Sequence, residues 1–255
     1  MRISPKFFNA AALAAVLLAP AARAGTIEQR ALVPLQRMSD TLAAAKSFSY
    51  QSRTVLEVPA KTGQVITLVS EANVALRRPD KLIARFTGEA PHFDFYYDGA
   101  TASAYAPGNS VYSTTKAPAT IDAMLPALQN ETGIRIASAG LLRSNPFAAL
   151  TQGMTSAVLM GAVQIDGEPC DHLAFRRDGV NWEIWIPTGS KALPRRLAAT
   201  FTDRPGNTRV LVEFSNWNLH PLLHPGDFEF HPPRGSREIP FLSVVRPSTL
   251  GRTQP

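Results

Sequence analysis

Residues 47–217 contain repeated runs in which apolar and polar side chains alternate, and short turn sequences join these runs. Alternation with a period of two is typical of strands that bury one face. The turns include Asp98-Gly99, Asp166-Gly167 and Asp178-Gly179, which can adopt the positive φ angles of tight hairpins. Tight hairpins place consecutive strands antiparallel. The pattern therefore predicts a meandering antiparallel sheet.

The clearest run spans residues 66–77, where Ile66, Leu68, Ala72, Val74 and Leu76 lie on one side and polar residues on the other. Residues 93–97 follow the same rule, with Phe93, Phe95 and Tyr97 on one side. Further strands are expected at 82–87, 158–165, 172–176, 182–186, 196–201 and 210–217, with a short closing strand at Phe228-Glu229-Phe230.

Two regions follow a helical period instead. Residues 27–45 place apolar side chains at Leu35, Met38, Leu42 and Ala45, which is the spacing of one buried helix face. Residues 118–153 interrupt the alternation; Ile121, Met124, Leu125 and Leu128 predict one helix there, and residues 146–150 a second helical piece.

The order of these elements predicts an α+β fold that is mainly β. Neighbouring strands rotate by about 20° relative to each other, so a long sheet must curl or be covered by something apolar. We therefore expect a curled antiparallel half-barrel with helices on its concave face. A single half-barrel domain is expected over residues 25–240, followed by a mobile basic tail at 241–255.

The N-terminus predicts export. Arg2 and Lys6 precede an apolar stretch at residues 10–19, and Ala22-Arg23-Ala24 provides the small residues of a signal-peptidase site. We expect residues 1–24 to be a signal peptide cleaved after Ala24, which leaves a periplasmic protein. The apolar stretch is too short to span a bilayer and no cysteine follows the cut, so neither a transmembrane segment nor a lipid anchor is expected after cleavage.

Charge and cysteine usage exclude some partners. The formal charge of +6 falls to about +3 once Arg2, Lys6 and Arg23 leave with the signal, and the remaining basic residues are scattered. Nucleic acid is therefore not an expected partner. Cys170 is the only cysteine, so no internal disulfide can form, and on a strand we expect a buried thiol.

Candidate catalytic motifs lack the context that they require. Ser113-Thr114-Thr115-Lys116 and Lys61-Thr62-Gly63 match two boxes of penicillin-recognising enzymes, but in the wrong order and with the serine at a strand end. No Gly-x-Ser-x-Gly sequence is present. We expect no catalytic residues and no enzyme.

A metal or other cofactor is likewise not expected. His220, His224 and His231 lie close together in the sequence, but Pro221 and Pro225 favour extended loops between them. No pair of ligands falls at an i, i+4 spacing on a predicted helix. Surface or turn histidines are the simpler interpretation.

Several segments resemble an uncharacterised family of predicted periplasmic proteins over residues 31–240. They are Arg37-Met38-Ser39-Asp40-Thr41-Leu42, Ser47-Phe48, Arg78-Pro79-Asp80, Phe95-Tyr96-Tyr97-Asp98-Gly99 and Pro169-Cys170-Asp171-His172-Leu173-Ala174-Phe175. The ending Asp227-Phe228-Glu229-Phe230-His231-Pro232-Pro233 is also similar to that of the Lol lipoprotein carriers. That likeness implies an open half-barrel with helices as a lid, and an apolar space between them that accepts acyl chains.

The favoured hypothesis is a periplasmic binding protein for an apolar or acyl-chain ligand. Its alternative is an envelope scaffold or sensor that binds protein partners through loops and the basic tail. Whether the apolar side of the sheet lines a cavity or is plain core is left open by the sequence. The candidate ligand-lining residues are Ile66, Leu68, Val74, Leu76, Phe93, Phe95, Tyr97, Met124, Leu128, Trp182 and Ile184.

Overall fold

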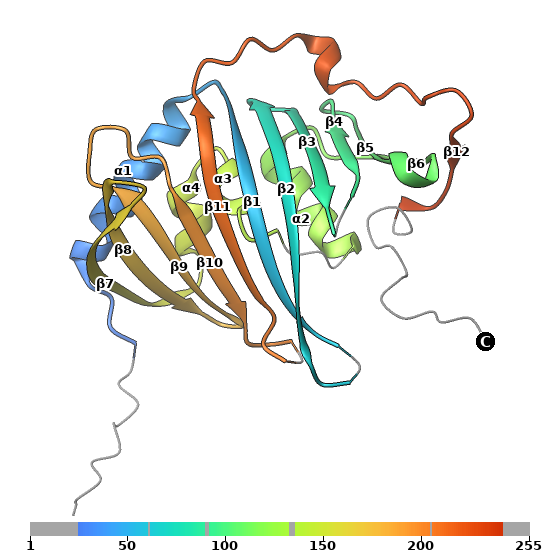
Figure 1. Cartoon of the computed structure of the whole chain (residues 1–255). Helices are drawn as coiled ribbons and strands as arrows, with labels where there is room; N and C mark the ends of the chain where they lie inside the picture. The colour runs from blue at the N-terminus through green and yellow to red at the C-terminus, as the bar shows by residue number, and fades with distance from the viewer. Residues whose placement is uncertain (1–24, 61, 90–91, 133–135, 205, 242–255) are drawn as a thin grey trace, which may run out of the picture.

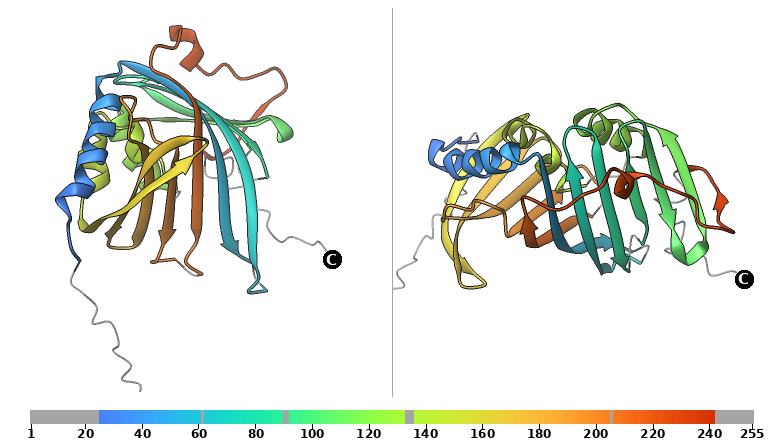
Figure 2. Two further views of the ribbon diagram at one scale, coloured as in Figure 1. Left: turned by 60° about the vertical axis from the view of Figure 1, so that its left-hand side comes forward. Right: turned by 90° about the horizontal axis from the view of Figure 1, so that it is seen from above.

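A computed structural model describes residues 25–60, 62–89, 92–132, 136–204 and 206–241. Twelve strands form one sheet in the order β12-β6-β5-β4-β3-β2-β1-β11-β10-β9-β8-β7 (Figure 1). The sheet curls around helices that lie on its concave face (Figure 2). The predicted α+β half-barrel is therefore confirmed. The signal peptide predicted for residues 1–24 lies outside the described residues.

The strands form two meanders that meet where β1 pairs with β11. The first meander comprises β1 (Ser47–Pro59), β2 (Val65–Arg77), β3 (Lys81–Gly88), β4 (Asp94–Tyr97), β5 (Thr101–Ala106) and β6 (Val111–Lys116). The second comprises β7 (Met154–Ile165), β8 (Glu168–Arg177), β9 (Val180–Pro187), β10 (Arg196–Phe201) and β11 (Arg209–Asn218). A parallel strand, β12 (Arg237–Glu238), pairs with β6.

Glycine makes the predicted hairpins possible. Gly99, Gly167 and Gly179 have φ angles of 90°, 78° and 72°. Side chains other than glycine rarely adopt these angles, so the Asp-Gly sequences confine the reversals to these positions. The long β1–β2 pair stays in register from Ser47 opposite Arg77 to Pro59 opposite Val65, which keeps one set of side chains on the concave face throughout.

The helices are α1 (Gln29–Ala44), α2 (Ile121–Thr132), α3 (Ala139–Leu142) and α4 (Pro146–Thr151), with two 3₁₀ turns at Pro107–Asn109 and Pro225–Phe228. Helix α1 packs on β7, β9 and α4. Its residues Leu35, Met38 and Leu42 are completely buried, as the spacing predicts. Each such side chain contributes roughly 1.5–3 kcal/mol of burial energy, which holds the helix on the sheet. No helix among the described residues is long and apolar enough to cross a membrane.

The segment after β11 corrects one prediction. Phe228-Glu229-Phe230 is not a strand: Phe228 ends a 3₁₀ turn that begins at Pro225, and Glu229 and Phe230 are irregular. Proline fixes the first residue of that turn, and the carboxylate of Asp227 accepts a hydrogen bond from the His224 N–H at 2.7 Å. This capped turn, and not the alternation of apolar side chains, therefore determines the local structure.

We call residues 219–241 the C-terminal strap. The strap crosses from β11 to the far edge of the sheet (Figure 1), where Arg237–Glu238 pairs with β6. On the convex face Phe228 is fully buried, and the Phe230 ring lies 5.4–6.0 Å from the rings of Tyr96, Tyr105 and Tyr112. Phe241, the first residue of the predicted tail, belongs to the hydrophobic core; residues 242–255 lie outside the described chain.

Candidate functional site

The concave face of the sheet is apolar across most of its width. Eight of the eleven candidate residues are buried there or on α2, with exposures between 0% and 8%; they are Val74, Leu76, Phe93, Phe95, Tyr97, Met124, Trp182 and Ile184. All eight belong to one hydrophobic cluster, against which the partly buried Leu128 packs. The structure thus brings nine of the predicted residues together, and under the helices they are packed against other protein side chains.

The remaining two candidates, Ile66 and Leu68, lie elsewhere on the same face. The β1–β2 hairpin extends beyond the helices (Figure 1), and Ile66 and Leu68 point from this extension to the concave side, where they are partly exposed. On β1 they face Val58 and Leu56, which are also partly exposed. The apolar face therefore continues past the helices. We call these four residues the uncovered end of the concave face.

The β2–β3 turn is tied to the helices by a partly buried arginine for which the sequence analysis predicts no contact. Arg78 Nη1 donates to the carbonyl oxygen of Leu142 at 2.9 Å, and its guanidinium lies 5.7 Å from the ring centre of Phe48. Burial lowers the pKa of Arg78, and the carboxylate of Asp122 partly opposes this effect. Its Nε atom is buried and has no hydrogen-bond partner among the described residues.

Helix α2 begins at the same junction. The N–H of Ile121 donates to the carbonyl oxygen of Pro79 at 2.8 Å, and Asp122 accepts a bond from the Ser144 N–H at 2.8 Å. The Arg143 guanidinium lies 3.5 Å from the same carboxylate. The β2–β3 turn is therefore hydrogen-bonded to α2 and α3. Helix α2 is itself bonded to the segment that follows α3. This junction fixes one end of the helical layer on the sheet.

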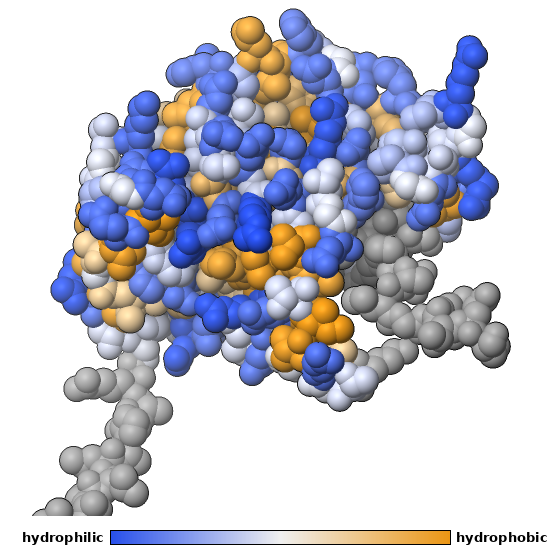
Figure 3. Space-filling view, in the orientation of Figure 1, coloured by the Kyte–Doolittle hydropathy of each residue, from blue (hydrophilic) through white to orange (hydrophobic). Residues whose placement is uncertain are grey.

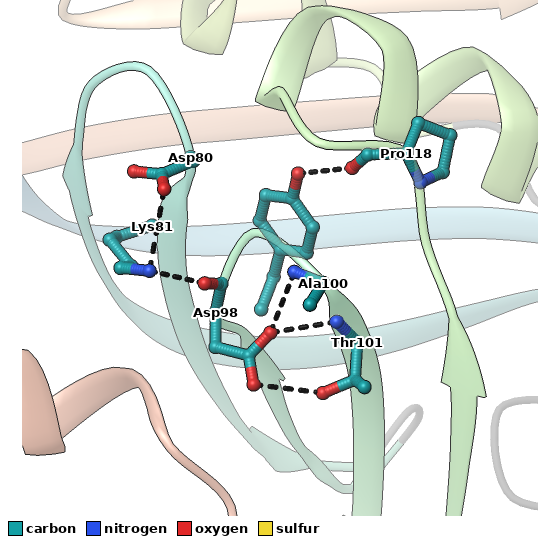
Figure 4. Close-up of polar contacts among 7 residues, drawn as sticks. Asp80, Lys81, Asp98, Ala100, Thr101 and Pro118 are labelled. Atoms are coloured by element: carbon teal, nitrogen blue, oxygen red, sulfur yellow. Dashed lines mark hydrogen bonds and ion pairs between the residues drawn. The ribbon is translucent and has the colours of Figure 1, made fainter.

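A second network stiffens the sheet beside this junction (Figure 4). The Asp98 carboxylate accepts bonds from the N–H groups of Ala100 and Thr101 at 2.9 and 2.7 Å and from the Thr101 hydroxyl at 2.9 Å. Burial favours the neutral acid, but these bonds outweigh it and lower the pKa of Asp98. Lys81 donates to the Asp98 carbonyl oxygen and lies 3.4 Å from the carboxylate of Asp80. The Asp98 carboxylate and the Lys81 ammonium therefore have their partners within the network.

Tyr97 links this network to the concave face. Its side chain is fully buried, and its hydroxyl donates to the carbonyl oxygen of Pro118 in the segment before α2 (Figure 4). Burial raises the pKa of Tyr97 to about 12, with a further contribution from the negative charges of Asp80 and Asp98. Tyr97 is thus a neutral hydrogen-bond donor at physiological pH.

Cys170 and Ser113, neither of which we expect to be catalytic, are both buried. Cys170 is buried, as predicted, and burial together with the nearby Glu168 carboxylate raises the pKa of the thiol. A raised pKa disfavours the nucleophilic thiolate. Ser113 is buried, and Lys61 of the second motif lies outside the described residues.

Histidines are also dispersed. His172 lies on the convex face, where its Nε2 is 2.8 Å from a Glu183 carboxylate oxygen and its ring stacks on Trp185 at 4.3 Å. His220, His224 and His231 on the strap are exposed. Among the described residues, no group of three or more histidine, cysteine or acidic side chains is placed to hold a metal ion.

Two hollows adjoin the strap. One, of about 550 Å³, lies at the β6 edge between Ser113, Thr115, Glu131 and Phe241. The other, of about 390 Å³, lies between the convex face and the strap and includes Lys81. Neither hollow is lined by the candidate ligand-lining residues.

The fold and face described above define a class of structure: an open antiparallel half-barrel with an apolar concave face and helices bonded across it. The chain belongs to the family described as Predicted periplasmic protein (DUF2092), whose sequence model matches residues 31–242. The predicted family resemblance is therefore confirmed. No curated protein matches the sequence.

Several solved structures are similar to this chain at low sequence identity. An uncharacterized conserved protein from Thermus thermophilus is 11% identical, with a TM-score of 0.48 over 83% of this chain and 99% of that chain. The lipoprotein LppX from Mycobacterium tuberculosis is 16% identical, with a TM-score of 0.47 over 76% of this chain and 97% of that chain. A LolA superfamily protein from Nitrosomonas europaea is 12% identical, with a TM-score of 0.41 over 78% of this chain and 97% of that chain.

Proposed function

We propose that this protein is a periplasmic binding protein that holds an apolar ligand, such as an acyl chain, against the concave face of the sheet. One observation carries the proposal: the apolar face continues from the packed cluster under the helices to the partly exposed residues Ile66 and Leu68 at the uncovered end. Such a surface loses contact with water when an apolar chain covers it.

The energetic requirement is modest. Each methylene removed from water contributes about 0.8 kcal/mol, so ten methylenes contribute on the order of 8 kcal/mol before the entropic cost of binding. Apolar lining alone therefore suffices, and no catalytic group or cofactor is needed. Because the face is filled under the helices, we infer that a ligand first contacts the uncovered end and extends further only if the helices move away from the sheet.

The location also agrees with the family, which is described as predicted periplasmic. Export is proposed to follow from the N-terminal sequence, with cleavage after Ala24. Sequencing the N-terminus of the exported protein tests this cleavage.

Titration of the purified protein with a fluorescent fatty acid tests ligand binding. Leu68→Asp should reduce binding at least tenfold, because a carboxylate at the uncovered end must lose water when the chain covers it. Val69→Asp is the matched control: Val69 is the next residue, is also partly exposed, and points to the convex face. Equal binding by both variants, or no binding by the wild-type protein, would contradict the proposal.

A scaffold function is the alternative, and the filled concave face favours it, since eight of the candidate residues already pack as a core. In that function the loops and the strap contact protein partners. Native mass spectrometry of protein purified from its host separates the two functions. Co-purifying lipid supports the binding protein, and a lipid-free protein with a stoichiometric protein partner supports the scaffold.

A further inference from the structure

The two ends of the sheet differ in how they are protected. At one end, the strap covers the edge strand β6 by pairing Arg237–Glu238 with it. At the other end, β7 is the last strand. Strand β7 spans twelve residues, Met154–Ile165, and contains no charged residue and no proline. Natural proteins use charges and prolines to prevent edge strands from pairing with other chains, and this edge has neither.

The first half of the β7 edge is already paired by the chain's own N-terminal arm. The N–H of Ala157 donates to the carbonyl oxygen of Thr26 at 2.9 Å. The N–H of Glu28 donates to the carbonyl oxygen of Ala157, also at 2.9 Å. The carboxylate of Glu28 then accepts a bond from the Leu159 N–H at 3.2 Å, which ends this arm. This edge therefore accepts an added strand.

Residues 160–165, which we call the open edge, follow the arm. A bulge between Leu159 and Gly161 shifts the register with β8, after which the pairing continues to Ile165 opposite Glu168. In the described ranges, backbone hydrogen bonds from outside β8 do not reach the open edge. Because alternate residues of a strand point their N–H and C=O groups away from the neighbouring strand, the open edge presents unpaired donors and acceptors.

Two exposed apolar side chains lie on the open edge itself, and two more lie on elements next to β7. Met160 is 58% exposed and Val163 39% exposed on β7, and Ile27 of the arm is 43% exposed. Val33, on the α1 helix that packs on β7, is 66% exposed. These are four of the seven large apolar residues that are exposed in the described chain. Orange side chains mark this edge at the lower left of Figure 3.

We propose that the open edge pairs with the open edge of a second copy of this chain, so that two half-barrels share one continuous antiparallel sheet. A second copy fits because β7 carries no charge, so that self-pairing places no like charges opposite each other. In the pair, the unpaired backbone donors and acceptors of each open edge bond to those of the other copy. The proposal is independent of ligand binding on the concave face.

Symmetry restricts the geometry. A two-fold axis perpendicular to the sheet keeps each side chain on its own face, and opposite residues in an antiparallel pair share a face. Two residues that lie opposite each other must therefore both have even numbers or both have odd numbers. The average of their numbers is then a whole number, and the residue with that number lies on the axis and faces its own copy. For an open edge of residues 160–165, that residue is Ala162 or Val163.

A six-residue strand pair is a small interface, so the dimer should be reversible and depend on concentration. Sedimentation equilibrium of the mature full-length protein at concentrations from about 1 µM to 1 mM should show dimerisation. The double variant Met160→Lys, Val163→Lys should weaken it by about tenfold or more, because each copy then brings two positive charges to the shared edge and loses both of its exposed apolar side chains there. Val65→Lys is the matched control, since Val65 is 61% exposed on the β1–β2 hairpin; it should leave dimerisation unchanged.

Cross-linking tests the register. Val163 lies opposite Cys170 on β8, so the cysteine variants are made on a Cys170→Ala background to prevent an internal disulfide. Oxidation of Ala162→Cys or of Val163→Cys should then give a covalent dimer, and Val65→Cys should not. A wild-type protein that stays monomeric throughout, or a dimer that survives both lysines at full strength, would overturn the proposal. Circular dichroism confirms that each variant is folded.

Discussion

Arg78 donates to the backbone carbonyl oxygen of Leu142 at 2.9 Å, and so joins the residue after β2 to the last residue of α3. The same guanidinium lies over the ring of Phe48 on β1. A single side chain thus contacts the sheet and the helical layer at the end where the two are joined. A charged hydrogen bond of this kind contributes about 1.5–3 kcal/mol, more than a surface ion pair.

We expect Arg78→Met to lower the free energy of unfolding by about 2 kcal/mol, because it leaves the Leu142 carbonyl unpaired while keeping much of the side-chain volume. Urea denaturation measures this change. Arg85→Met is the control, since Arg85 is 59% exposed and its nearest carboxylate oxygen, on Asp94, is 4.0 Å away. An Arg78→Met protein as stable as the Arg85→Met protein would show that the junction contributes little.

The strands were predictable because local patterns determine them. Asp-Gly sequences reverse the chain, and alternation assigns each side chain to a face; Phe95 and Tyr97 are buried on the concave face as expected. Residues 196–201 were predicted as a strand and form β10 with the same bounds. The pairing of β1 with β11 could not be predicted in the same way, since no local signal specifies which distant strands meet.

The junction and the strap show where sequence reasoning fails. Arg78 has the sequence context of an ordinary turn residue, and only the tertiary structure places its guanidinium beside the carbonyl of Leu142. Phe228 and Phe230 alternate like strand residues, yet Pro225 and Asp227 make a 3₁₀ turn there. Alternation likewise assigned the candidate residues of the strands to one face, but it cannot distinguish a packed face from one that lines a cavity.

Truncation of two candidate residues measures how tightly that face is packed. Phe95 is 5% exposed and Ile184 is fully buried, and both belong to the hydrophobic cluster. Phe95→Ala and Ile184→Ala should each lower the free energy of unfolding by about 2–5 kcal/mol, because each leaves a cavity in a filled core.

Val65→Ala is the control for these truncations; Val65 is 61% exposed, so the change should be within about 0.5 kcal/mol. Urea denaturation curves provide all three values. Losses near 1 kcal/mol for both buried residues would indicate that they border open space, contrary to the structure.

Tyr97 gives the protein a specific dependence on alkaline pH. Its pKa is raised to about 12 by burial and by Asp80 and Asp98, whereas an unfolded tyrosine ionises near pH 10. Because the folded pKa is the higher one, the neutral hydroxyl stabilises the folded state fully below about pH 10, and this stabilisation is lost as the pH rises to about 12.

Tyr97→Phe removes this ionisation and the hydrogen bond to the Pro118 carbonyl oxygen. Near neutral pH the variant should be less stable than the wild type by about 1 kcal/mol, the typical value of one hydrogen bond. Between pH 10 and about 12 the wild type should lose its advantage, because its unfolded state gains a tyrosinate that the variant lacks. Urea denaturation at several pH values gives this difference directly. A difference that stays constant up to pH 12 would mean that Tyr97 ionises as readily in the folded protein as in the unfolded chain, and therefore that its hydroxyl is not held in the buried position that the structure shows.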